Sequence, residues 1–222
     1  MATFPEYTLM FRRTLLAAVG LALVAIAPVS AQVLGLPVVN SGVPVGIQVA
    51  ADVGIANADY GKGTTVGASA AIGVGFFGVG VQVARYSPHK GDVLTSPGSQ
   101  DAVTATGFNA SMRLVGGPLV PFRIMAMGGV AHWSMNSVGY THIPLSVGLA
   151  ATIPNPAFGI KPWIAPRLDM VRSGGRTDSN FGISAGIDLA MLNGLSIRSA
   201  YDLLGLEGRK PGILSFGLGF AL

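Results

Sequence analysis

The chain has no cysteine, so neither disulfide bonds nor thiolate metal sites can contribute to its fold. Charge is also scarce: Asp, Glu, Lys and Arg make up 11 % of the 222 residues, whereas a soluble surface carries about 25–35 %. The net charge of +4 is too slight to indicate a nucleic-acid partner. Half of the residues are nevertheless apolar. A charge-poor, apolar chain without cysteine indicates a protein whose outer surface does not face water.

The chain also lacks an apolar run long enough to cross a membrane as a comfortable helix. The longest run, Leu15–Ala27, follows two arginines and is followed by small residues at 29–31 that a signal peptidase accepts. We therefore expect residues 1–31 to be a cleaved secretory signal. An uncleaved anchor is the alternative, and the start is either Met1 or Met10.

What the rest of the chain has instead is alternation with a period of two. From Val45 to Ala56, apolar residues alternate with small or polar ones, and the same pattern recurs nine more times. Most of the ten segments match the roughly 9–11 residues with which a tilted strand crosses a bilayer. We expect ten strands, with eight and twelve as alternatives. The segments lie near 45–56, 65–76, 79–86, 103–115, 122–133, 143–153, 160–171, 180–191, 195–202 and 212–222.

The connections between these segments alternate between short and long. Such alternation is typical of an up-and-down barrel, with turns at one rim and loops at the other. The sequence therefore predicts an all-β fold, an up-and-down antiparallel transmembrane β-barrel, formed by residues 32–222 as one domain. We expect turns at 77–78, 116–121, 154–159 and 192–194, and loops at 57–63, 87–102, 134–142, 172–179 and 203–211.

The two faces of the predicted strands differ in charge. The apolar face carries only Arg85, at a rim where a long side chain can reach lipid headgroups. A soluble lipocalin-like carrier, the main alternative, would place its apolar face inside, so we expect a barrel with an apolar exterior and a polar lumen. The lumen face holds the remaining strand charges, which are Asp52, Arg113, Arg123, Lys161, Arg167, Asp169, Asp188, Arg198 and Asp202.

The turn at 192–194 sets the register of two neighbouring strands. A three-residue turn with Gly194 in the left-handed conformation keeps the apolar residues on one face. It also places Asp188 opposite Arg198 as a cross-strand ion pair. We expect the lumen charges to pair in this way and to close the lumen.

Aromatic residues gather at the two ends of the predicted strands, where they are expected to form girdles at the membrane interfaces. The turn-end girdle contains Phe76, Phe77, Phe122, Phe158 and Phe220, and the loop-end girdle contains Tyr60, Tyr86, Trp133, Tyr140, Phe181 and Tyr201.

The last eight residues alternate Ser215 and Gly217 with large apolar residues and close on Phe220 and Leu222. This pattern resembles the C-terminal insertion signal of bacterial outer-membrane β-barrel proteins, although Leu222 replaces the usual terminal aromatic. As a whole the chain resembles the small surface-antigen and porin-like barrels. The resemblance implies the outer membrane of a double-membraned bacterium, contact with its lipid and lipopolysaccharide, and insertion by the barrel-assembly machinery.

One short motif raises the question of catalysis. His132-Trp133-Ser134 resembles the His-x-Ser of outer-membrane lipid A deacylases, because residues two apart on a strand share a face. The third member of such a site is a carboxylate, and none lies between His132 and Asp169. We therefore expect no catalytic residues, cofactor or metal, and a non-enzymatic structural or surface barrel with a largely plugged lumen. A small diffusion pore is the alternative, and a deacylase-like enzyme is less favoured.

Overall fold

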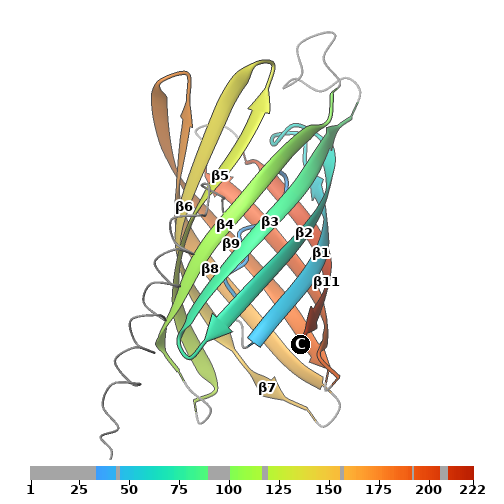
Figure 1. Cartoon of the computed structure of the whole chain (residues 1–222), viewed down its shortest axis with the longest axis vertical. Helices are drawn as coiled ribbons and strands as arrows, with labels where there is room; N and C mark the ends of the chain where they lie inside the picture. Colours follow the sequence, from blue (N-terminus) through green and yellow to red (C-terminus); the bar gives the residue numbers. More distant parts are fainter. Residues whose placement is uncertain are drawn as a thin grey trace, which may run out of the picture.

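The computed structural model describes residues 34–43, 46–89, 101–116, 120–155, 158–191, 193–205 and 210–222. Every regular element in these ranges is a β-strand (Figure 1). Within them, no helix has the length and apolar character needed to cross a membrane. The strands are β1 (Gly46–Ala56), β2 (Gly63–Val74), β3 (Phe77–Pro88), β4 (Val103–Val115), β5 (Phe122–Met135), β6 (Val138–Ala151), β7 (Ile153–Pro154), β8 (Phe158–Ser173), β9 (Arg176–Met191), β10 (Leu195–Gly205) and β11 (Gly212–Ala221).

The strands close into an antiparallel up-and-down barrel, which confirms the predicted fold class and strand count. Each long strand pairs with the next along the chain, β6 pairs with β8, and β11 pairs with β1 to complete a ring of ten. The two-residue β7 only extends one edge of β8. We call the rim where β1 begins and β11 ends the terminal end, and the opposite rim the loop end.

Three predicted connections are wrong in position or length. The turn expected at 77–78 is formed by residues 75–76, where Gly75 adopts a positive φ of 64°. The loops expected at 134–142 and 172–179 are two-residue turns, at 136–137 and 174–175, that join longer strands. All four of these turn residues have positive φ, as type I′ hairpin turns require. The hairpins β5–β6 and β8–β9 therefore extend as long two-stranded tips at the loop end (Figure 1).

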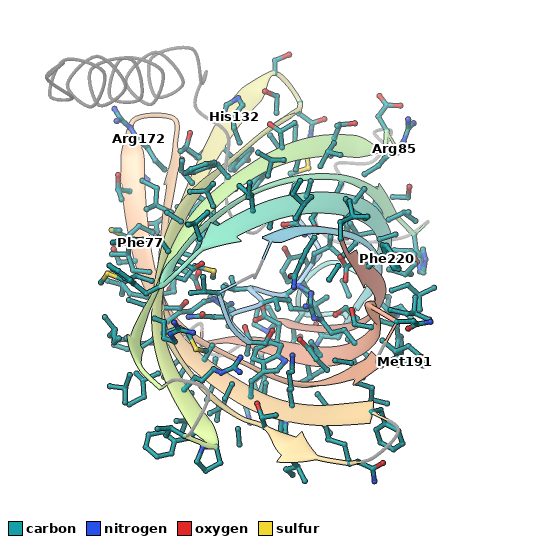
Figure 2. All side chains as sticks on the ribbon, turned by 60° about the horizontal axis from the view of Figure 1, so that its bottom comes forward. Phe77, Arg85, His132, Arg172, Met191 and Phe220 are labelled. Carbon is teal, nitrogen blue, oxygen red and sulfur yellow. The ribbon has the colours of Figure 1, made fainter. Side chains whose placement is uncertain are left out.

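The exterior of the barrel is apolar and the interior polar. Val49, Val66 and Ile72 point outward and are 44 %, 60 % and 47 % exposed, while Asp52 and Asp188 are buried. Figure 2 shows side chains radiating from the ring on all sides. Such an exterior would be unfavourable in water but is expected in lipid, because apolar residues then contact acyl chains.

Only the girdle at the terminal end matches the prediction closely. Phe76, Phe77 and Phe220 are exposed there on the outer surface. At the loop end Phe181 is also exposed, but Trp133 and Tyr86 are buried in the lumen, so their assignment to the outer girdle is wrong. Both belong to apolar clusters that fill the lumen.

The C-terminal residues close the barrel. Val49 pairs with Phe220, and the Leu222 amide donates a hydrogen bond to the Ile47 carbonyl at 2.8 Å. Ser215 is buried toward the lumen, whereas Phe220 and Leu222 are exposed. Recognition of these residues by an assembly machinery stays a prediction, and the expected signal over residues 1–31 lies outside the described residues.

The two faces should respond differently to a charge. We expect Val53→Arg to destabilise the barrel by about 2–4 kcal/mol, because Val53 is exposed on the outer surface well inside β1, so that the guanidinium would lie within the lipid-facing band. Ala50→Arg, three residues away on the opposite face of the same strand, should cost clearly less, because Ala50 lines a luminal cavity. Reversible urea unfolding in lipid vesicles measures both values. Equal costs would contradict the assignment of the two faces.

Candidate functional site: a plugged and charged lumen

A segment that the sequence analysis did not place fills much of the lumen. Residues 34–43, which we call the plug segment, precede β1 and lie inside the ring of strands (Figure 2). Leu36, Val38 and Asn40 are only 1 %, 2 % and 2 % exposed. The segment runs from the loop end, where Gly35 meets Tyr60, to the terminal end, where it joins β1.

Apolar side chains of the plug segment pack against opposite walls of the barrel. Leu36 belongs to a buried cluster with Ala84, Ala105 and Trp133, from β3, β4 and β5. Val39 and Val43 pack against a second cluster that includes Met125 and Trp163 and draws on β5, β6, β8 and β10. Because the segment contacts walls on both sides, it obstructs the lumen rather than lining it.

Glycines on the inner wall make room for the plug segment. A Cβ atom at Gly54 would lie 2.1 Å from the Gly35 carbonyl oxygen, and one at Gly67 would lie 2.6 Å from Leu36 Cδ1. At Gly148 it would lie 2.4 Å from the Asn40 carbonyl oxygen. Real Cβ atoms do not approach other atoms so closely, so any larger residue at these positions would displace the segment.

Polar contacts hold the plug segment in one position. Asn40 Nδ2 donates to Ser146 Oγ at 3.0 Å, and Ser41 Oγ donates to Asp188 Oδ2 at 2.7 Å. The Gly35 amide donates to the Tyr60 hydroxyl at 3.0 Å. Tyr60 lies in the 57–62 loop, where burial raises the pKa of its hydroxyl and keeps the group neutral.

The loop-end half of the lumen holds a buried group that we call the loop-end ion cluster: His142, Arg167, Asp169, Ser184 and Asp202. Arg167 Nε donates to Asp169 Oδ2 at 2.7 Å, and Arg167 Nη2 donates to Asp202 Oδ2 at 2.9 Å. Arg167 Nη1 also contacts Asp202 Oδ1 and donates to Ser184 Oγ at 2.6 Å. His142 Nε2 lies 2.7 Å from Asp169 Oδ1.

This cluster forms a crosslink between four strands. Its members come from β6, β8, β9 and β10, and each is at most 5 % exposed. Charges buried so deeply are tolerated only when paired and hydrogen-bonded. His142 was expected in a loop, but it faces the lumen from β6, so that prediction is wrong.

A second group, the terminal-end ion cluster, is built around Asp188 and Arg198. Arg198 Nε and Nη2 donate to the two carboxylate oxygens of Asp188 at 3.0 and 3.2 Å, as the register of the 192–194 turn predicts. Trp163 Nε1 adds a third donor at 3.2 Å, and Ser41 adds a fourth. Asp52 interacts electrostatically with Arg198 from β1. The plug segment is therefore bonded directly to a charge pair of the wall.

Three of the predicted lumen charges form no close ion pair with a carboxylate among the described residues, although Asp188, opposite Lys161 on β9, interacts with it electrostatically. Arg113 Nη2 donates instead to the Gly75 carbonyl at 3.2 Å, at the terminal rim, so its expected place in the charge network is wrong. Arg123 and Lys161 line a cavity of ≈ 330 Å³ in the terminal half of the lumen. The predicted network is thus divided into two separate clusters and a cavity.

Sequence reasoning missed four polar residues that complete the clusters: Ser41, His142, Trp163 and Ser184. Trp163 and Ser184 both stand at inward positions of predicted strands, so their alternation could have placed them in the lumen. For the other two no such signal exists, because Ser41 precedes the first strand and His142 stood in an expected loop.

The possible catalytic pair lies on the outside of the barrel. His132, labelled in Figure 2, is exposed at the loop end. Ser134 is exposed as well, and Trp133 between them is buried. His132 Nδ1 lies 3.5 Å from Thr141 Oγ1, whereas the histidine of a catalytic triad is oriented by a carboxylate. Within the described ranges, no three His, Asp or Glu side chains gather as a metal site would require.

Comparison with solved structures identifies the fold. The β domain of the Bordetella autotransporter BrkA has a TM-score of 0.54 and 10 % identity, over 79 % of this chain and 98 % of that one. This chain is a β-barrel of the bacterial outer-membrane type. The N-terminal barrel of Pseudomonas aeruginosa OprF (16 % identity, 80 % and 97 % covered) and Neisserial surface protein A (14 %, 79 % and 96 %) each have a TM-score of 0.37.

The sequence itself matches no protein-family model and no curated protein. The predicted location, the outer membrane of a double-membraned bacterium, agrees with this fold and with the apolar exterior. These structural likenesses concern the arrangement of strands and do not identify a partner or a substrate.

Removing the cation of the loop-end ion cluster should be costly. Arg167→Met would leave two buried carboxylates without their guanidinium, and we expect a loss of about 3–5 kcal/mol in the free energy of unfolding. Arg172→Met is the matched control, because Arg172 is exposed on the same strand (Figure 2), and it should change stability by less than about 0.5 kcal/mol. Urea unfolding monitored by tryptophan fluorescence measures both, and similar values would contradict the role of the cluster.

Proposed function

We propose that this protein is a non-enzymatic outer-membrane barrel whose lumen is closed by its own plug segment. One observation carries the proposal: the plug segment lies between opposite walls with Leu36, Val38 and Asn40 buried, and it is bonded to Ser146 and Asp188. A barrel of ten strands is narrow, and side chains alone fill most of such a lumen. The plug segment narrows this lumen further, which supports a closed barrel.

In this proposal the terminal end faces the periplasm and the loop end faces outward. The apolar band between them spans the bilayer, with the exposed phenylalanines of the terminal end at one interface. The hairpins β5–β6 and β8–β9 then extend beyond the outer leaflet (Figure 1). Their tips carry polar, exposed residues such as Arg176, Thr177 and Asp178, which supports a role as a structural barrel that presents a surface to the exterior.

A small diffusion pore is the second candidate, and the cavity of ≈ 330 Å³ is the observation that favours it. The cavity occupies only the terminal half of the lumen, so a continuous pore would require the plug segment to leave. Departure would break its bonds to Ser146 and Asp188 and expose Leu36 and Val38. The intact protein should therefore spend most of its time closed.

Conductance separates the two candidates. Refolded protein comprising residues 32–222 should produce little or no steady current in planar bilayers, because the plug segment blocks the lumen. Removing residues 34–43 should produce discrete open channels, since the wall glycines would then border empty space. A variant that keeps the segment's length but replaces Leu36 and Val38 by serine should open intermittently. Steady conductance of the unaltered protein, unchanged by the deletion, would reject the plug and support the pore.

A further inference from the structure

The cavity in the terminal half of the lumen has the size and opening of a binding site. Its volume of ≈ 330 Å³ falls at the lower end of the range of about 300–1,000 Å³ typical of small-molecule sites. Gln48 lines it and is exposed although it faces inward, and Gly194 and Ala221 of the terminal rim also contribute. A solute can therefore enter from the terminal end, while the plug segment closes the other side.

The charges around this cavity do not balance. Arg123, Lys161 and Arg198 line it, together with only two acids, Asp52 and Asp188. Asp188 already accepts hydrogen bonds from Arg198, Trp163 and Ser41, and Asp52 interacts with Arg198. In the described part of the chain, neither Arg123 nor Lys161 forms a close ion pair. Asp188, opposite Lys161 on β9, attracts it electrostatically, but this carboxylate is already bound by Arg198.

Arg123 and Lys161 act on the same space. The pairing of β5 with β6 and of β6 with β8 places Arg123 in one row with Trp163, two residues from Lys161. The two cations are near enough to interact electrostatically. Arg123 Nε is buried, and no described group accepts a hydrogen bond from it. An unpaired buried donor on a cation, next to a second cation, is unfavourable until an anion binds.

The neutral wall of the cavity suits a polar ligand. Amide and hydroxyl groups of Gln48, Gln82, Asn109 and Ser111 line it and can donate or accept hydrogen bonds. The planar guanidinium of an arginine binds two oxygens of one oxyanion at once, and a lysine adds a point charge. We propose that this cavity binds a small molecule bearing an oxyanion, a carboxylate or a phosphate, which Arg123 and Lys161 hold. The proposal goes beyond the function suggested above and does not depend on whether the barrel conducts.

Titration calorimetry on the refolded barrel in detergent tests this site. The probes are inorganic phosphate and succinate, each added at constant ionic strength so that general screening stays fixed. We expect saturable binding of at least one probe with one site per barrel. Phosphate alone, succinate alone, or both would each support the site and would show which oxyanion it prefers.

Three variants make the test specific. Arg123→Gln and Lys161→Gln should each weaken binding at least about tenfold, the loss expected when one charge-assisted contact of about 1.4 kcal/mol is removed. Arg113→Gln removes the same charge from the terminal rim, outside the cavity lining, and should bind like the unaltered protein. Heat-modifiable migration in detergent gels establishes that each variant is folded. Should Arg123→Gln not fold, Lys161→Gln decides.

Two results would overturn the proposal. One is the absence of saturable binding for both probes. The other is an equal loss of affinity in Arg113→Gln, which would mean that the anions respond to net charge rather than to the cavity. Conductance enters neither comparison, so the failure of this site would be distinguishable from the failure of the plugged-barrel proposal.

Discussion

Space inside a closed ring of ten strands is the constraint on which the rest of this structure depends. Such a ring leaves a lumen that ordinary side chains would fill. The plug segment fits because the wall carries glycine where the segment comes closest: Gly54 and Gly67 beside Leu36, and Gly148 beside Asn40. The many glycines on the lumen face are therefore complementary to the plug segment rather than signs of a weak strand.

The same constraint arranges the buried charges. Long polar side chains can lie flat in the lumen where the neighbouring strand carries glycine, as Arg167 and Asp169 do over Gly182 and Asp52 does over Gly217. Arg167 thereby reaches Asp169 of its own strand and Asp202 two strands away, and Arg198 reaches Asp188 of the neighbouring strand. The cost of burying charge is offset by several charge-assisted hydrogen bonds. Both ion clusters join strands that are not all sequence neighbours, and so they stabilise the closed ring as a whole.

The positions of the strands could be predicted from the sequence because each strand has one face in lipid. That face must be apolar at every second residue, and the pattern from Val45 to Ala56 shows how clearly it can be seen. Beyond the bilayer the requirement ends, and the prediction fails there: two-residue turns at 136–137 and 174–175 stand where the sequence predicts long loops. His142 was misplaced for the same reason, since it stands on β6 where the outward alternation has already faded.

The plug segment could not be predicted because its residues follow neither the two-residue period of a strand nor the 3.6-residue period of a helix. They pack against an irregular surface assembled from many strands, and such a surface exists only after the ring has closed. The pair Asp188 and Arg198, in contrast, follows from a single turn between neighbouring strands and could be placed from the sequence. Ser41 connects the plug segment to this ion pair of the barrel wall, because its hydroxyl donates to Asp188, the carboxylate that Arg198 binds.

Movement of the plug segment is thereby coupled to the charge pair of the wall. Loss of the bond from Ser41 would leave Asp188 with fewer donors, just where the terminal half of the lumen is already rich in cations. Arg198 would still neutralise the carboxylate, so the wall could remain closed while the plug segment moved. The apolar contacts of Leu36 and Val38 must then supply most of the resistance to opening. Both side chains are buried while the lumen is closed, and that burial is lost once water enters the lumen.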